Sequence, residues 1–152
     1  MLKGKTALVT GSTSGIGLGI AQALAAQGAN IIANGFGDAD GAKAEIARAG
    51  SGIQVGYHGA DMSKPAEIEA MMQYIDQTFG GCDILVNNAG IQFVANVDEF
   101  PTDRWDAIIA INLSSAFHTM RLALPGMKKR GWGRVINIAS THGLVASAGK
   151  SA

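Results

Sequence analysis

Apolar residues along the chain follow two alternating patterns, which predict strands and helices in turn. Short and nearly continuous apolar runs are typical of strands that are buried on both faces of a sheet. They predict five strands, at residues 5–10, 29–34, 53–57, 83–86 and 134–139. Between these runs, apolar residues recur every three or four positions, as on one face of a helix. This second pattern predicts helices at residues 16–27, 39–49 and 63–79, and two consecutive helices between residues 101 and 130.

Strands that alternate with helices along the whole chain predict a parallel sheet, because neighbouring parallel strands need a crossover connection. Right-handed crossovers place helices on both faces of that sheet. Ligands of such sheets bind beyond the carboxyl ends of the strands, where the strand order reverses. Glycine-rich or polar segments follow four of the predicted strands, and we expect them to meet at this rim: residues 11–17, 61, 87–90 and 140.

The first of these segments is the turn Thr10-Gly11-Ser12-Thr13-Ser14-Gly15-Ile16-Gly17, between the first strand and the first helix. Gly11 can adopt backbone angles closed to other residues, Gly15 leaves room for a phosphate, and Gly17 lets the helix approach the strand. The free amides and the dipole of the first helical turn favour an anion. A tight turn without a ligand is the alternative, but its position favours a nucleotide site. We therefore expect residues 1–152 to form one Rossmann-type dinucleotide-binding domain, a doubly wound α/β sheet that stops after its fifth strand.

Composition and charge argue against several partners without identifying one. The 12 basic and 12 acidic residues give a net charge of zero, so nothing suggests nucleic acid binding. The apolar runs are shorter than a membrane span, no signal peptide precedes the first strand, and the basic run 128–130 is expected to be a solvated helix end. Cys82 is the only cysteine, which favours a small buried side chain in a reducing compartment. We expect a cytoplasmic protein without a metal site or membrane contact.

The spacing of the motifs resembles that of the short-chain dehydrogenase/reductases over the whole chain. The residues that carry the resemblance are the glycine turn, Asp61, Asn87-Asn88-Ala89-Gly90, Asn112 and Ser140. It implies hydride transfer with NAD(P), with the glycine turn at the pyrophosphate and Asp61 near the adenine. The cofactor contacts that it implies come from Gly11, Thr13, Ser14, Gly15, Ile16, Gly17, Phe36, Asp61, Asn88, Ala89 and Gly90.

The resemblance also implies two catalytic residues. Ser140 would hydrogen-bond the reacting oxygen, and Asn112 would help to hold a water in a proton relay. Without the resemblance, a turn residue at a strand end and a helix cap would be the simpler interpretations of the two. His58 and His118 have no such companions and are expected to be structural.

Within the family, residues 132–140 and 142–152 are similar to the bacterial D-3-hydroxybutyrate dehydrogenases. This similarity implies oxidation of a small hydroxy acid, D-3-hydroxybutyrate, to acetoacetate. The substrate carboxylate needs a cation and hydrogen-bond donors, and Gln92, His142 and Lys150 match positions that those enzymes use for it. Three unrelated loop residues are the alternative. A ketoreductase for acyl-carrier-protein or sugar substrates would not need this cluster.

The segment Asn34-Gly35-Phe36-Gly37 bears on the choice of cofactor. At the end of the second strand, relatives specific for NAD usually have an acidic residue for the ribose hydroxyls, whereas Arg or Lys serves the extra phosphate of NADP. This segment contains neither. The absence of a cation disfavours the phosphate, and the similar hydroxybutyrate dehydrogenases use NAD. We therefore expect NAD.

The Tyr-x-x-x-Lys pair of the family is expected about a dozen residues after the serine and does not occur within residues 1–152. We therefore expect these residues to be the N-terminal part of a longer enzyme, which in this family is commonly a homotetramer. Without the tyrosine as proton donor, we expect residues 1–152 alone to be inactive. The fifth strand would also expose an apolar edge, so we expect them to be prone to aggregate. A catalytically inactive dinucleotide-binding module is the alternative from another functional class.

Overall fold

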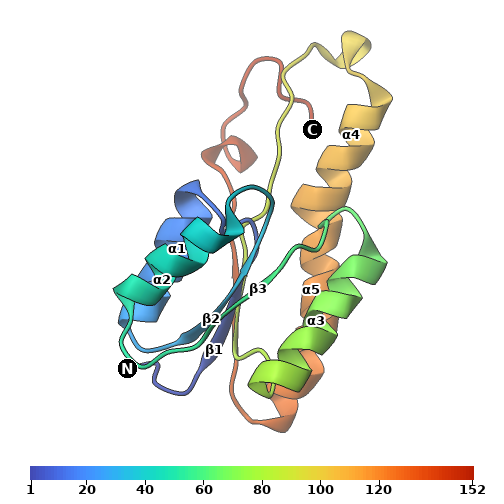
Figure 1. The fold of residues 1–152 in the computed structure, drawn as a ribbon. Helices are drawn as coiled ribbons and strands as arrows, with labels where there is room; N and C mark the ends of the chain where they lie inside the picture. Colours follow the sequence, from blue (N-terminus) through green and yellow to red (C-terminus); the bar gives the residue numbers. More distant parts are fainter.

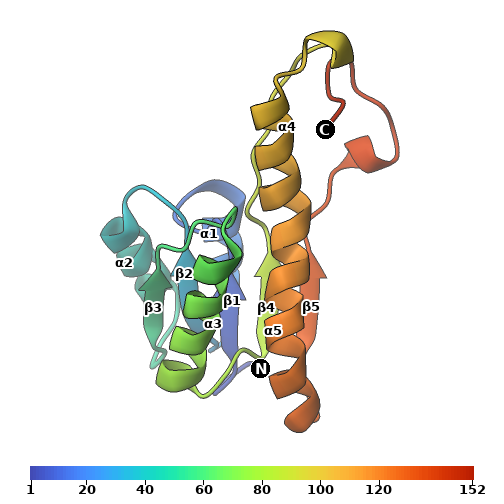
Figure 2. The same cartoon turned by 90° about the vertical axis from the view of Figure 1, so that its right-hand side faces the viewer.

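A five-stranded parallel sheet forms the centre of the structure, a computed structural model that describes all residues from 1 to 152. The strands lie side by side in the order β3-β2-β1-β4-β5 (Figure 2). Their bounds are β1 Thr6–Val9, β2 Asn30–Asn34, β3 Val55–His58, β4 Ile84–Asn87 and β5 Arg134–Asn137. The prediction of a doubly wound α/β sheet with five strands is confirmed.

Helices cover both faces of the sheet, with α1 and α2 on one face and α3 and α5 on the other (Figure 1). Because successive side chains of a strand point to opposite faces, β1 contributes to both cores. Ala7 and Val9 pack with the residues of α1, whereas Leu8 packs with those of α3. The helical bounds are α1 Gly15–Ala26, α2 Ala39–Ala49, α3 Pro65–Phe79, α4 Thr102–Ile108 and α5 Ser115–Lys129, with short 3-10 turns at Val97–Glu99 and Thr141–Gly143.

The strand order reverses between β1 and β4, which are hydrogen-bonded neighbours. The chain after β1 leads to α1 and the chain after β4 leads through α4 to α5. Because α1 and α5 lie on opposite faces of the sheet, the two segments diverge at this end of the sheet. A crevice forms where such segments part. The carboxyl ends of β1 and β4 therefore define the rim at which the glycine turn and residues 87–90 meet.

Helices α4 and α5 form one continuous rod, although two helices were predicted between residues 101 and 130. A π-helical segment at Ile109–Ser114 joins them without a break (Figure 2). By length and apolar composition, the helix Thr102–Lys129 could cross a membrane, a test that core helices also pass. In the structure, α5 packs against α3 and β4.

Strand ends differ from the prediction by one or two residues, mainly because pairing continues past the regular ladder. Thr10 lies beyond β1, yet its N–H still donates to the carbonyl oxygen of Val86 at 3.0 Å. Likewise, Ile138 lies beyond β5 and donates to the carbonyl of Asn87 at 2.9 Å. Strand β5 has a neighbour on one side only, and Ile136 and Ile138 are 43% and 42% exposed. The outer edge of the sheet is therefore apolar and unpaired here.

Candidate active site

The glycine turn brings the start of α1 close to the end of β1. Gly11 has a φ of +63°, and a Cβ there would lie 2.9 Å from the Cα of Ala89. A Cβ at Gly17 would collide with the carbonyl oxygen of Gly11 and lie 2.5 Å from Nδ2 of Asn88. Gly15 instead faces open space. The first turn of α1 is thus held against the sheet, with its outer side free for a ligand.

Thr10 and Asn88 tie this turn to the segment after β4. The hydroxyl oxygen of Thr10 accepts hydrogen bonds from the backbone N–H groups of Asn88 and Ala89, at 3.0 and 2.9 Å. The side-chain amide of Asn88 donates to the carbonyl oxygens of Thr10 and Gly11, at 2.9 and 3.1 Å. The amide protons of Asn88 are therefore used within the protein. Its part in a cofactor site would be to fix the turn.

A cleft of about 270 Å³ opens above these contacts. It is lined by the ends of β1, β2 and β4 and the segment after β3. Eight of the predicted cofactor residues line it: Gly11, Thr13, Ser14, Phe36, Asp61, Asn88, Ala89 and Gly90. The other three lie elsewhere in the turn, because Gly17 is buried beneath it, Gly15 faces open space and the exposed side chain of Ile16 lines a second cavity.

The loop after β2 forms one wall of the cleft and is held at two carbonyl groups. Thr13 Oγ1 donates to the carbonyl oxygen of Phe36 at 2.6 Å, and the hydroxyl of Tyr57 donates to that of Gly35 at 2.7 Å. The Phe36 ring itself is largely exposed. Gly35 has a φ of +141°, and a Cβ there would lie 2.8 Å from Thr13 Oγ1. The position after β2 is thus closed to a side chain, acidic or basic.

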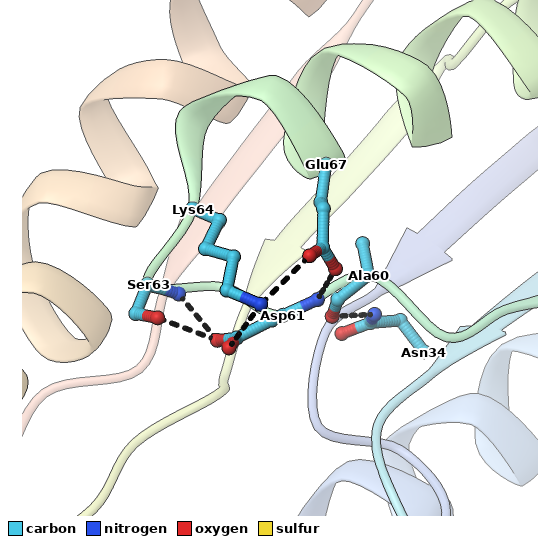
Figure 3. A network of polar contacts seen from close by, with 6 residues as sticks. All are labelled: Asn34, Ala60, Asp61, Ser63, Lys64 and Glu67. Atoms are coloured by element: carbon cyan, nitrogen blue, oxygen red, sulfur yellow. Dashed lines mark hydrogen bonds and ion pairs between the residues drawn. The ribbon is translucent and has the colours of Figure 1, made fainter.

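Asp61 lies on the opposite wall, within the network shown in Figure 3. Its Oδ1 accepts from the hydroxyl and the backbone N–H of Ser63, at 2.7 and 2.9 Å, and Lys64 Nζ lies 3.5 Å from Oδ2. The hydrogen bonds from Ser63 and the nearby Lys64 ammonium lower the pKa of Asp61. Glu67 accepts from the backbone N–H of Asp61 at 2.8 Å and pairs with Lys64 at 3.0 Å. The Asp61 carboxylate is therefore kept ionised at the rim of the cleft.

Asn34, the last residue of β2, is the polar residue of this region that the sequence pattern did not single out as a site residue. Its side chain is fully buried, and its amide contacts the glycine turn and the segment after β3. An asparagine that ends an otherwise apolar strand and precedes glycine was the available signal. From the sequence, Asn34 was considered only for the choice of cofactor, as part of a segment with neither an acidic nor a basic residue.

A second cavity of about 680 Å³ adjoins the cleft, and the two share Gly90 and Ile91. The structure brings all five predicted catalytic and substrate residues to its lining: Gln92, Asn112, Ser140, His142 and Lys150. They come from the loop after β4, the π-helical segment and the stretch after β5. The last stretch is held near the loop after β4 by a hydrogen bond of 2.9 Å from Ala95 N–H to the carbonyl of Gly149.

The side chains in this cavity already have partners that set their orientation. The Asn112 amide pairs with the backbone of Ile91, accepting from its N–H at 2.9 Å and donating to its carbonyl at 2.8 Å. Ser140 Oγ accepts from the backbone N–H of His142 at 3.2 Å, so its own proton is free for another acceptor. His142 Nδ1 lies 3.3 Å from the carbonyl oxygen of Val145. A carbonyl can only accept, so this contact places a proton on Nδ1.

Comparison with known proteins agrees with this geometry. The model of the short chain dehydrogenase family matches residues 5–152. The D-beta-hydroxybutyrate dehydrogenase of Cupriavidus necator is 80% identical over 100% of this chain and 59% of its own length. That of Rhizobium meliloti is 61% identical over 97% of this chain and 58% of its own length. The chain thus spans less than two thirds of these relatives.

Solved structures have the same fold. A metagenomic short-chain oxidoreductase in complex with NADP superposes with a TM-score of 0.91 at 32% identity, over 99% of this chain and 68% of that one. A xylitol dehydrogenase bound to NAD+ has a TM-score of 0.91 at 27% identity, over 99% of this chain and 58% of that one. With a family model that matches nearly every residue, the chain belongs to the short-chain dehydrogenase family.

Proposed function

We propose that the protein to which these residues belong oxidises D-3-hydroxybutyrate to acetoacetate with NAD as the hydride acceptor. The observation that carries the proposal is the second cavity, where Ser140 shares one space with Gln92, His142 and Lys150 beside the glycine cleft. The 80% identity to a D-beta-hydroxybutyrate dehydrogenase supports the same substrate.

The nicotinamide, when bound, supplies the acceptor for the hydride of the hydroxyl-bearing carbon. Ser140 would donate its free hydroxyl proton to the reacting oxygen. Lys150 would pair with the substrate carboxylate, and Gln92 would donate a hydrogen bond to it. His142 would present Nε2 to the substrate, since Nδ1 is directed at Val145. For the base that takes the hydroxyl proton, we propose the tyrosine of the family's Tyr-x-x-x-Lys pair, beyond residue 152.

The choice of NAD is supported by the charges at the cleft. Asp61 is the only charged residue among those that line it, and neither Lys nor Arg is present. A phosphate on the adenosine ribose would therefore enter without a cation to compensate its charge. Gly35 leaves no place for a side chain of either sign, so discrimination would rest on the missing cation.

The test is a steady-state assay of the protein expressed from its complete reading frame. We expect a far higher kcat/KM for D-3-hydroxybutyrate with NAD than with NADP, and little turnover of the L enantiomer. Equal efficiency with NADP would overturn the cofactor assignment. Reduction of acetoacetyl thioesters without oxidation of free hydroxybutyrate would instead support the 3-oxoacyl-carrier-protein reductases, of which that of Vibrio cholerae is 38% identical.

A further inference from the structure

We propose that Asn34 is the positioning residue that fixes the spacing between the glycine turn and the segment after β3, which both line the first cleft. It would thereby set the affinity for the adenosine half of the dinucleotide. This inference rests on the proposed use of a dinucleotide and not on the identity of the substrate. The nicotinamide has to reach Ser140 in the second cavity, so the adenosine half falls in the cleft that Asn34 lines.

The Asn34 side chain makes hydrogen bonds with three backbone groups in two segments. Its Nδ2 donates to the carbonyl oxygens of His58 and Ala60, at 2.9 and 3.0 Å, and its Oδ1 accepts from the N–H of Gly11 at 3.3 Å. The orientation of the amide is fixed by this pattern, because the reverse would place Oδ1 against two carbonyl oxygens. One buried side chain thus connects the glycine turn to the segment after β3.

The backbone of Asn34 adds a second connection to the turn. Its N–H donates to Ser12 Oγ at 3.1 Å, and its carbonyl oxygen accepts from the Ser12 N–H at 2.7 Å. The side chain of Asn34 and that of Ser12 are fully buried. Asn34 is therefore held to the glycine turn by its backbone as well, and movement of the segment after β3 would have to break its Nδ2 contacts.

The Nδ2 contact with Ala60 acts on the peptide group that carries Asp61. The carbonyl of the Ala60–Asp61 peptide accepts from Asn34, and the N–H of the same peptide donates to Glu67 Oε2 at 2.8 Å (Figure 3). The plane of this peptide is thus held from both sides. Because the peptide direction sets where the Asp61 side chain starts, Asn34 and Glu67 together place Asp61 at the rim of the cleft.

The most direct test is Asn34→Asp, which keeps the volume of the side chain and the acceptor for Gly11. It replaces Nδ2 by an oxygen that faces two carbonyl oxygens, so the wall after β3 is released. Asn30→Asp is the matched control on the same strand. Asn30 Oδ1 accepts from the N–H of Gln54 at 2.9 Å, and the substitution retains that acceptor at the end of β2 remote from the cleft.

The measurement is calorimetric titration of the complete protein with ADP-ribose, which carries the adenosine half and the pyrophosphate but lacks the nicotinamide, together with thermal unfolding. We expect Asn34→Asp to raise the Kd for ADP-ribose about ten-fold or more, and Asn30→Asp to leave it unchanged. A folded Asn34→Asp protein with the original Kd would overturn the proposal, as would equal weakening by Asn30→Asp.

If Asn34→Asp does not fold, a second variant tests the proposed positioning of the segment after β3. Glu67→Ala removes the other support of the Ala60–Asp61 peptide from a half-exposed position, where the fold tolerates a change. We expect about a three- to ten-fold rise in the Kd for ADP-ribose, and an unchanged Kd would contradict the proposal that Asn34 and Glu67 together position Asp61. Weakened ADP-ribose binding supports the proposal even if hydroxybutyrate is not oxidised, so the two proposals fail separately.

Discussion

Arg130 at the end of α5 forms an ion pair with Asp83 just before β4, with 3.1 Å between Nε and Oδ1. The Arg130 guanidinium also donates to the carbonyl of Cys82 at 2.7 Å, and Asp83 Oδ2 accepts from the N–H of Thr6 at 3.1 Å. Residues 128–130 are all exposed, as expected for a solvated helix end, but Arg130 in addition has these structural partners. This residue fastens α5 to the amino ends of two strands.

Arg130→Ala should lower the free energy of unfolding by about 1–3 kcal/mol, because it leaves the Asp83 carboxylate, only 12% exposed, without its cation. Urea unfolding followed by circular dichroism measures the change. Lys129→Ala is the control, since Lys129 is exposed and should change stability by less than about 0.5 kcal/mol. Equal effects of the two substitutions would contradict a structural role for the ion pair.

Gly17→Ala should destabilise the protein by about 1–3 kcal/mol and weaken dinucleotide binding, because the added methyl collides with the carbonyl of Gly11. Gly19→Ala lies two residues further along α1 and meets nothing within 4 Å. It should stabilise the helix by about 0.5–1 kcal/mol. Thermal unfolding should show opposite changes in stability for the two substitutions, and a titration with NAD should show weaker binding by the Gly17→Ala protein. A neutral Gly17→Ala would mean that α1 can move away from the sheet.

Lys150→Ala tests the proposed carboxylate contact. In the complete enzyme, we expect kcat/KM for hydroxybutyrate to fall roughly ten- to a thousand-fold, as for loss of a charge-assisted contact in a desolvated site. The Kd for NAD should stay the same, because Lys150 lines the second cavity and not the cleft. Unchanged kinetics would remove Lys150 from the substrate site, and a parallel loss of NAD binding would indicate a general disturbance.

The network of Asp61, Lys64 and Glu67 should make the cleft wall sensitive to acid. Hydrogen bonding from Ser63 lowers the pKa of Asp61 below 3.8, and hydrogen bonding from the Asp61 N–H lowers that of Glu67 below 4.5. Groups with a lowered pKa in the folded state stabilise it above their unfolded pKa, and this contribution is lost as the pH falls through the folded value. We expect Glu67→Gln to flatten the dependence of unfolding free energy on pH below about 4.5. The same slope in both proteins would contradict this.

Cys82 should resist thiol reagents in the native protein. Burial raises the pKa of its thiol to about 12, from 9.0, so very little thiolate is present near pH 8. Because the pKa of Cys82 is higher in the folded state, its contribution to the free energy of unfolding is complete below pH 9 and is lost as the pH rises toward 12. Labelling by iodoacetamide should be slow in buffer and rapid in urea. Rapid labelling of the native protein would show that the region between α3 and β4 opens.

The sequence was sufficient for the order of strands and helices along the chain and for the rim at which the segments after the strands meet, because both follow from local patterns. The residues of the second cavity were predicted through the family resemblance instead. Apolar runs marked the strands, and the segments after them met at one rim as parallel strands require. The long-range hydrogen bonds and ion pairs that hold these segments together could not be predicted from the sequence. Nothing local shows that Asn34 bonds to Ala60, or that Arg130 reaches Asp83 across 47 residues, since these pairs exist only after the chain has folded.

Continuity between α4 and α5 could not be predicted for a related reason. The apolar residues between 105 and 111 and those between 117 and 127 form two groups in the sequence, and each group was interpreted as a separate helix. In the structure, a wider π-helical turn joins the two helices. Asn112, which would be a helix cap in the simpler interpretation, lies within this turn and pairs with Ile91.

The wider turn at Ile109–Ser114 amounts to a surplus residue within an otherwise regular rod. Removing one residue there would restore ordinary helical winding and leave α4 and α5 in nearly the same relative orientation, because a π-helical turn holds one extra residue in about the same rotation. Asn112 lies within this turn and would be displaced from Ile91, and the loop that separates the two cavities would lose its attachment. Among proteins that keep this site, the length of the rod should be invariant between Ile109 and Ser115, whereas its ends are free to vary.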